Sequence, residues 1–349
     1  MHEPSVRLCE GPEGARIAFA SLGRGPPLVL VPGWLCHLHE LWTHPAAASA
    51  RRKLTAVHQL TWYDRLGCGL SDRQGFALTL ENDVQQLTAV MDAAGIERAS
   101  LIGYSFGGPP AAVFAARHPE RVQRLVFCSA FARGSAITTR ERLEALKQVV
   151  HMNWNVGSRT LAAMLVPNGG AREMQWYGRF QRMAASSGMA AQLLDHLWTM
   201  DVRDVLPALT MPVLVVHNRG DRAVPLSAGH EIAALVPGAQ FEALDGNEHD
   251  PFIRDSGSLV DLILHFLAGR PPGAEHHAPT PGGELSSRER EVLQHIAEGA
   301  SNKAIATALG ISVGTVERHV SHIYSKLPAH GRADLALRAV KLGLVSPAP

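Results

Sequence analysis

The segment Gly103–Gly107 has the pattern G-x-S-x-G and narrows the possible folds of this chain more than any other segment. An apolar run, residues 99–102, precedes it, and a run of small residues with helical character, 111–116, follows it. The order is therefore strand, sharp turn and helix, with Ser105 at the apex of the turn. Glycines on both sides allow such a turn to close tightly, and the serine hydroxyl then stands exposed above the sheet.

Composition bounds the class of protein. The chain has 349 residues, 46% of them apolar, which suffices for one large and one small domain. A net charge of +1 excludes a globally basic coat for nucleic acid but allows a local basic face. The four cysteines form no C-x-x-C pair, which argues against a zinc site or disulfide framework. With no signal segment and no run of roughly 18 apolar residues, we expect a cytoplasmic protein without metal, cofactor or membrane contact.

Short apolar runs alternate with helical patterns over the first 268 residues. The expected strands cover residues 16–20, 28–31, 59–63, 99–102, 122–128, 212–217 and 240–244. Residues 79–94 form an amphipathic pattern with apolar residues at a spacing of three to four, which predicts a helix. Strands that alternate with helices predict a parallel sheet covered by helices on both faces.

Two polar residues follow predicted strands where serine chemistry needs them. A nucleophilic serine requires a base to accept its proton and a carboxylate to orient that base. Asp221 follows the strand 212–217, and His249 follows the strand 240–244. Together with the turn 32–34 and the segment 63–72, these loops resemble the α/β-hydrolase family, in particular its lid-bearing esterases and C–C-bond hydrolases.

This resemblance implies a hydrolytic site made of three side chains and two backbone N–H groups. By that likeness the nucleophile, the general base and the orienting carboxylate are Ser105, His249 and Asp221. The oxyanion hole would consist of the backbone N–H groups of Phe106 and Trp34. Pro32 stands where the family more often has histidine, which removes a side chain and leaves the Trp34 donor in place.

Residues 134–205 interrupt the alternation with helical patterns, at the point where this family carries a lid. They hold six of the nine methionines and three tryptophans: Met152, Met164, Met174, Met183, Met189, Met200, Trp154, Trp176 and Trp198. One interpretation is that these side chains line an adaptable apolar pocket beneath the lid. The other is that they pack the lid against the body of the domain. Both stay open at this stage.

The composition changes after a predicted closing helix over residues 257–268. Residues 269–283 are rich in proline and glycine and have no apolar periodicity, which predicts a linker. We therefore expect an α/β-hydrolase domain over residues 1–268 with a lid at about 134–205, the linker, and a small all-α domain over residues 284–349.

The all-α segment carries the signals of a helix-turn-helix. Ser286 and Glu289 form a capping box at the start of a first helix. Ser301 is expected to cap a second helix, Gly310 to turn the chain, and residues 313–327 to form a third helix. Residues 285–345 closely resemble the LuxR-type DNA-binding domain.

The third helix separates into two faces. An apolar stripe at a spacing of three to four is expected to be buried: Val316, Val320, Ile323 and Leu327. The opposite face would enter the major groove of double-stranded DNA. Residues on this face, with flanking candidates for base and phosphate contacts, are Lys303, Thr315, Glu317, Arg318, Ser321, His322 and Lys326. Among them, Arg318 suits guanine and Glu317 suits cytosine. The fourth helix, after residue 332, would supply a dimer surface, as in the LuxR family.

These features favour a cytoplasmic transcription regulator that binds DNA as a homodimer. Its α/β-hydrolase-like domain would bind a small apolar ester, lactone or diketone, with or without hydrolysing it. The alternative is an active serine esterase or C–C hydrolase with an accessory DNA-binding tail. A ligand-binding pseudo-enzyme is a third interpretation.

Overall fold

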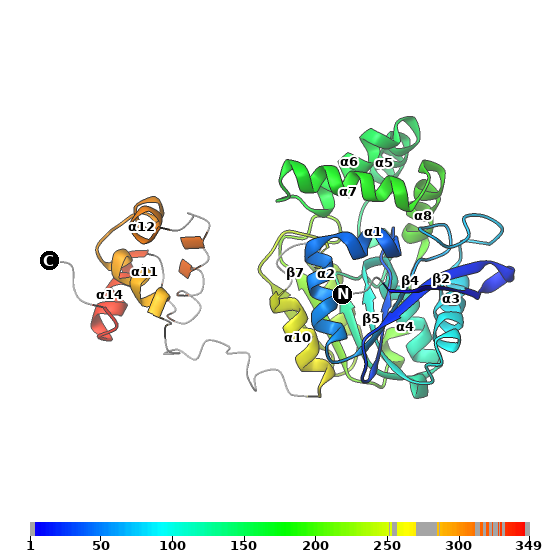
Figure 1. The fold of residues 1–349 in the computed structure, drawn as a ribbon, viewed down its shortest axis with the longest axis horizontal. Coiled ribbons are helices and arrows are strands. Elements are labelled where there is room, and N and C mark those ends of the chain that lie inside the picture. The colour runs from blue at the N-terminus through cyan, green and yellow to red at the C-terminus, as the bar shows by residue number, and fades with distance from the viewer. Residues whose placement is uncertain are drawn as a thin grey trace. The chain divides into compact units, whose positions relative to one another are not determined.

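The computed structural model describes residues 4–250, 252, 257–269, 285, 287–310, 315–316, 319–320, 323, 327, 329 and 332–345. The chain divides into two compact units, residues 1–269 and residues 270–349 (Figure 1). Within the described residues, no helix combines the length and the apolar character needed to cross a membrane.

The first unit is built on one eight-stranded sheet with the strand order β1-β2-β4-β3-β5-β6-β7-β8. The strands are β1 (Val6–Glu10), β2 (Arg16–Leu22), β3 (Pro27–Val31), β4 (Gln59–Tyr63), β5 (Ala99–Tyr104), β6 (Val122–Cys128), β7 (Val213–Asn218) and β8 (Gln240–Leu244). From β4 through β3 to β8, neighbouring strands pair in parallel. This confirms the α/β class and the parallel pairing predicted for these strands.

The prediction of a wholly parallel sheet is wrong at one edge. β1 pairs with β2, and β2 with β4, in antiparallel fashion. Only a 3₁₀ turn, η1 (Pro12–Gly14), lies between β1 and β2. A parallel pair needs a crossover of about a dozen residues or more, so a connection this short allows only a hairpin.

Helices cover both faces of the sheet, as the alternation predicts. They are α1 (Leu38–Thr43), α2 (Pro45–Thr55), α3 (Leu80–Ala93), α4 (Gly108–Arg117), α9 (Leu226–Leu235) and α10 (Gly257–Leu267), with 3₁₀ turns η2 (Ser105–Gly107), η3 (Pro119–Arg121), η4 (Gly134–Ala136) and η5 (Leu206–Ala208). α3, α4 and α9 pack on one face of the sheet, and α2 and α10 pack on the other.

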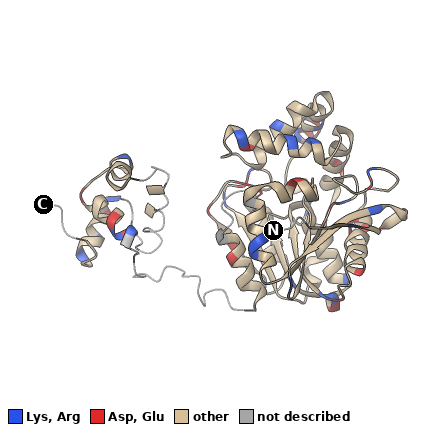
Figure 2. Cartoon of the chain, in the orientation of Figure 1, with Lys and Arg blue, Asp and Glu red and all other residues tan. Residues whose placement is uncertain are grey.

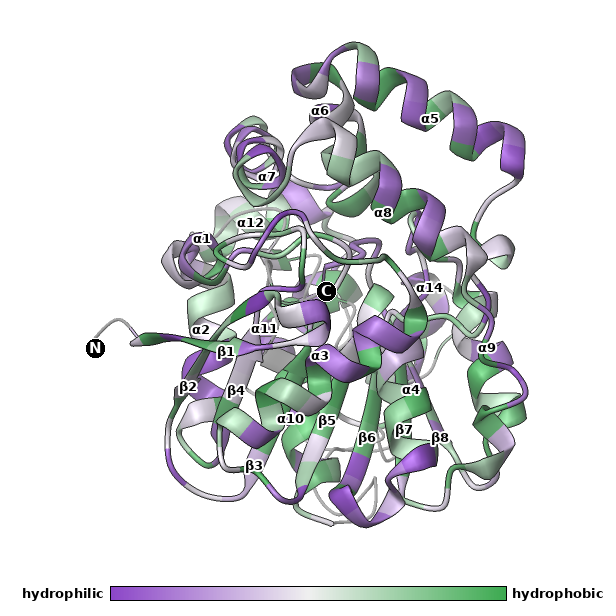
Figure 3. Ribbon diagram, turned by 90° about the vertical axis from the view of Figure 1, so that its right-hand side faces the viewer, coloured by the Kyte–Doolittle hydropathy of each residue, from purple (hydrophilic) through white to green (hydrophobic). Residues whose placement is uncertain are grey.

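The sheet forms the apolar centre of this unit. Strands β3, β4, β5 and β7 contain no lysine, arginine, aspartate or glutamate. In Figure 2 the charged residues accordingly concentrate on the surrounding helices and loops. In Figure 3 the central strands are largely hydrophobic, whereas the helices alternate between hydrophobic and hydrophilic residues along their length. Burial of these strands on both faces explains their continuous apolar runs.

Four helices between β6 and β7 form the lid: α5 (Arg140–Met152), α6 (Trp154–Leu165), α7 (Ala171–Ala184) and α8 (Ser187–Thr199). They lie together at one end of the sheet (Figure 1). Side-chain oxygens of Thr139, Asn153 and Ser186 accept backbone N–H groups at the starts of α5, α6 and α8. Such caps stabilise a helix by about 1 kcal/mol. Every lid helix except α7 therefore begins at a stabilising side-chain cap.

The second unit contains α11 (Ser287–Ala297), α12 (Asn302–Leu309) and α14 (Arg332–Lys341). Ser301 caps α12, and Gly310 ends it in the left-handed conformation, as predicted. The predicted cap Ser286 and most of the predicted third helix lie outside the described residues. The expected apolar stripe is confirmed where it is described: Val316, Ile323 and Leu327 are buried, and Val320 packs against the same cluster.

Candidate active site

The turn between β5 and α4 positions Ser105. This residue adopts a left-handed conformation with φ of 51°, which for a non-glycine residue is held only by strong surrounding constraints. The neighbouring glycines leave no space for side chains: a Cβ on Gly103 would lie 2.9 Å from Gly108 Cα, and one on Gly107 would lie 2.7 Å from Pro32 O. The glycines therefore allow the turn to pack directly on the 31–34 segment.

The structure brings the three predicted side chains together. Ser105 Oγ lies 2.7 Å from His249 Nε2, and His249 Nδ1 lies 2.8 Å from Asp221 Oδ2. A carboxylate can only accept, so Nδ1–H donates to Asp221, and Nε2 is left to accept the Ser105 hydroxyl. All three residues are buried. The arrangement suits removal of the serine proton by the imidazole.

Asp221 is fixed and kept ionised by its surroundings. Its Oδ1 accepts the backbone N–H groups of Ala223 (2.9 Å) and Val224 (3.0 Å). Burial acts to raise the pKa of Asp221, but the charge of His249 and the hydrogen bonds prevail, and the pKa lies well below its usual range. His217, which the sequence analysis did not single out, also lies 3.5 Å from Asp221 Oδ2.

The same pairing shifts His249. Burial alone would lower the pKa of this imidazole, yet the Asp221 carboxylate raises it above its ordinary value of 6.5. The loop that carries His249 is also tied to the lid, because His249 N donates to Leu165 O at 2.8 Å. The position of the base therefore depends on the lid as well as on the sheet.

The proposed oxyanion residues both lie beside Ser105. Phe106 follows it in the chain and is buried. Gly33 packs so closely that a Cβ there would lie 3.7 Å from Ser105 Cβ, and its neighbour Trp34 lines the same pocket as Ser105. The segment predicted to supply the second donor is thus in contact with the serine turn.

A pocket opens over Ser105 between the sheet and the lid. The lid contributes Leu165, Tyr177, Phe180 and Gln181 to its wall. None of the lid methionines or lid tryptophans lines it, so of the two open interpretations the pocket role is wrong for these side chains. Met200 is buried, whereas Met152 and Met183 are exposed.

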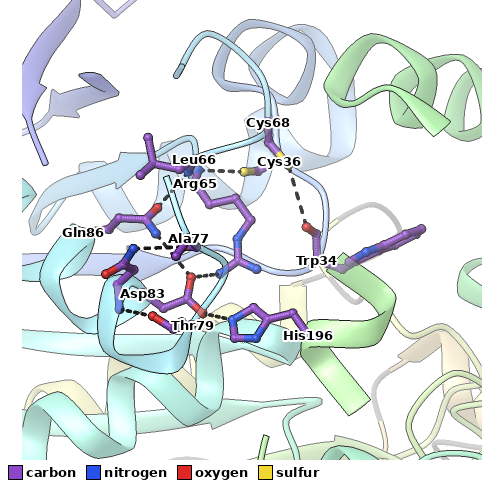
Figure 4. A network of polar contacts seen from close by, with 11 residues as sticks. Trp34, Cys36, Arg65, Leu66, Cys68, Ala77, Thr79, Asp83, Gln86 and His196 are labelled. Carbon is purple, nitrogen blue, oxygen red and sulfur yellow. Dashed lines mark hydrogen bonds and ion pairs between the residues drawn. The ribbon is translucent and has the colours of Figure 1, made fainter. Parts of the chain in front are cut away.

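A buried polar network links Arg65, Asp83 and His196 (Figure 4). Arg65 Nη2 donates to Asp83 Oδ1 at 3.3 Å, and His196 Nε2 of lid helix α8 lies 2.7 Å from Asp83 Oδ2. The Arg65 guanidinium carbon lies 3.6 Å from the centroid of the Phe106 ring, and the His196 ring meets the same ring edge-on at 5.4 Å. The network joins the lid, α3 and the residue after the serine.

Sequence models of two known families match this chain. The sequence model described as "alpha/beta hydrolase fold" matches residues 26–256. The chain belongs to the α/β-hydrolase fold family. A second model, described as "Bacterial regulatory proteins, luxR family", matches residues 283–339 of the same chain. The α/β-hydrolase domain is thus followed by a LuxR-type helix-turn-helix DNA-binding domain, as the resemblances implied.

Similar proteins agree with the α/β-hydrolase assignment. The chain is 31% identical to a 2-hydroxy-6-oxononadienedioate/2-hydroxy-6-oxononatrienedioate hydrolase from a Pseudomonas species, over 53% of this chain and 68% of that protein. It is 27% identical to a pimeloyl-[acyl-carrier protein] methyl ester esterase from Aliivibrio salmonicida, over 70% and 93%. An esterase structure from Exiguobacterium antarcticum matches with a TM-score of 0.68 at 18% identity, over 76% of this chain and 100% of that one, and shows the shared fold.

The predicted DNA-contacting residues are only partly described. Lys303 is exposed on α12, and Thr315 is half-buried. The others lie outside the described residues: Glu317, Arg318, Ser321, His322 and Lys326. Among the described residues no group of three or more histidine, cysteine or acidic side chains is arranged to hold a metal ion.

Proposed function

We propose that this protein is a cytoplasmic DNA-binding transcription regulator whose α/β-hydrolase domain binds a small ester, lactone or diketone over Ser105. The main support for this proposal is that one chain contains both the pocket over Ser105 and a LuxR-type DNA-binding domain. A ligand controls such a regulator if it binds two arrangements of the protein with different affinities. Turnover is not required for that control.

The chemistry proposed for the pocket uses the residues already described. Ser105 Oγ would attack the ligand carbonyl while its proton passes to His249 Nε2, which lies 2.7 Å away. The backbone N–H groups of Trp34 and Phe106 would stabilise the oxyanion. His249 then returns the proton to the leaving alcohol, and water, deprotonated by the same imidazole, releases the acid from Ser105. Burial of the site favours these charge-assisted steps.

We propose a homodimer as the DNA-binding form. One helix-turn-helix reads a short half-site with modest affinity, and two of them on a symmetric site give the affinity and specificity a regulator needs. Leu337, within α14, and Leu342, one residue after its end, are 62% and 61% exposed and offer apolar side chains for this contact. Leu335 of the same helix is fully buried in the domain core and cannot take part in this contact.

The decisive experiment measures binding of the full chain to duplex DNA from upstream of its own gene. We expect Arg318→Ala to weaken binding by about 5- to 160-fold, because one bidentate guanine contact contributes about 1–3 kcal/mol. Ser105→Ala should bind DNA like the natural chain in the absence of ligand. Fluorescence anisotropy at a fixed salt concentration gives both values. A full chain that binds no duplex at low salt contradicts the regulator.

A second candidate, an active serine hydrolase with an accessory DNA-binding tail, is favoured by the assembled Ser105–His249–Asp221 geometry. The two candidates differ in what Ser105→Ala does in cells. Loss of the biological output together with rapid ester hydrolysis by the natural chain supports the enzyme. Retained regulation in Ser105→Ala supports the sensor.

A further inference from the structure

Arg51 is a cation in an unusual position. It lies on α2, is only 6% exposed, and lines the same pocket as Ser105 and His249. Its neighbour Arg52 on the same helix is exposed. Arginine is almost never fully buried unless it is paired. We therefore expect a group that pairs with Arg51.

The described residues provide no anion in contact with Arg51. Arg51 Nη1 donates to Leu41 O at 2.6 Å, and the guanidinium carbon lies 5.7 Å from the centroid of the Trp62 ring. Its Nε is buried and has no hydrogen-bond partner, and no carboxylate of the described residues lies within ion-pair distance. Burial lowers the pKa of Arg51 to about 10, so the group is still charged at neutral pH. A buried charge without a paired anion is strongly unfavourable.

The two nearest acids do not take this role. Asp250 is already engaged, since Oδ2 accepts Tyr177 Oη at 3.2 Å and Oδ1 accepts Phe252 N at 3.1 Å. Asp64 Oδ2 accepts Leu70 N at 2.9 Å. Burial raises the pKa of both carboxyls, that of Asp64 to about 7. Neither carboxyl makes an ion pair with the guanidinium, and the raised pKa of each favours its neutral form over the charged one.

Two further donors in the pocket wall lack partners. The indole Nε1–H groups of Trp34 and Trp62 are buried and donate to no described residue. Both tryptophans line the pocket with Arg51. Small-molecule pockets are mainly apolar and carry a few polar groups that orient the ligand. Three of the unsatisfied atoms in this wall are donors, and two are acceptors, Asp64 Oδ1 and Gln181 Oε1. The donors select an acceptor on the ligand, and the charge of Arg51 selects an anion.

We propose that the ligand of this pocket carries a carboxylate that binds Arg51 while its ester or ketone carbonyl lies at Ser105. This inference rests on the proposed binding of an acyl carbonyl at Ser105. The planar guanidinium matches a carboxylate in two parallel hydrogen bonds. A singly charged carboxylate balances the one positive charge of Arg51, whereas a doubly charged phosphate would leave a negative charge unpaired in the buried pocket.

The test compares two esters that differ in the terminal group alone. The probes are the mono-p-nitrophenyl ester of adipic acid, which has a free carboxylate, and p-nitrophenyl hexanoate, which has a methyl group. Pimelic and suberic half-esters, with the matching neutral esters, scan the chain length. We expect the full-length natural chain to prefer one of the acidic esters in kcat/KM by about tenfold or more, since a hydrogen bond to a charged group contributes that much.

Substitution of Arg51 separates recognition from structure. Arg51→Met should lower the acidic-to-neutral ratio of kcat/KM by about tenfold or more, and Arg51→Lys, which keeps the charge without the planar fork, should give an intermediate ratio. Arg52→Met is the matched control and should leave the ratio unchanged. If Arg51→Met does not fold, the acidic-to-neutral ratios of kcat/KM for the natural chain and for Arg51→Lys still test the inference. A natural chain without preference, or a variant that slows both esters equally, overturns the inference.

Failure of the proposed chemistry gives a different result. If neither ester is hydrolysed, calorimetry of monomethyl adipate and methyl hexanoate with the same proteins replaces the rates. Selective binding of the acid, lost in Arg51→Met, supports the carboxylate site even though the triad does not turn over. Equal binding of both compounds, or binding of neither, contradicts the carboxylate site.

Discussion

At the residue scale, the reactivity of this site depends on one imidazole and the carboxylate that holds it. His249 must be neutral to accept the Ser105 proton, and the Asp221 carboxylate raises its pKa above 6.5. The same carboxylate orients the ring through a hydrogen bond of 2.8 Å. The carboxylate that orients the imidazole therefore also reduces the fraction of neutral His249 at mildly acidic pH.

We predict that ester hydrolysis falls as the pH drops, with the acid limb of kcat/KM centred above pH 6.5, because protonated His249 cannot act as a base. Asp221→Asn should move this limb to lower pH and reduce the maximal rate by about 10⁴. Asp245→Asn, whose side chain is 91% exposed, is the control and should keep the natural profile. An unchanged limb in Asp221→Asn speaks against this pairing.

At the scale of elements, the lid is joined to the body by charge as well as by apolar packing. Asp83 on α3 contacts both Arg65 and His196 of α8, and all three are buried. Arg65 and His196 in turn contact the Phe106 ring. Removal of the central carboxylate would leave Arg65 buried without a partner.

We predict that Asp83→Ala lowers the free energy of unfolding by about 3–5 kcal/mol, the usual effect of breaking a buried ion pair. The matched control is Glu81→Ala on the same helix, since the Glu81–Arg117 pair is about half exposed and should contribute less than about 1 kcal/mol. Chemical denaturation of both variants gives the comparison. Equal destabilisation of the two variants would show that the buried network adds nothing to stability.

At the scale of the whole molecule, two units with separate apolar cores share one chain. Control of DNA binding by a ligand then requires a difference between two arrangements of the molecule, and a dimer supplies such arrangements. The exposed side chains of Leu337 and Leu342 make the dimer testable.

We predict that Leu337→Glu combined with Leu342→Glu dissociates the dimer and weakens DNA binding at least tenfold, because charges would enter an apolar contact. Val57→Glu, at a site in the first unit that is 52% exposed, is the control. Sedimentation velocity reports the oligomeric state, and anisotropy reports the DNA affinity. A double variant that stays dimeric at the same concentration rules out this surface.

Local patterns in the sequence determined strands β2 to β8, the serine turn, the Ser301 cap and the buried stripe of the DNA-binding domain. They could do so because alternation, helical spacing and glycine placement act over a few residues. Only the tertiary structure decided the hairpin edge of the sheet, the packing of the lid methionines, the Asp83–His196 contact across 113 residues and the burial of Arg51. These features depend on which distant segments pack together. The local sequence pattern of a helix is the same whether a charged residue on it faces water or a pocket.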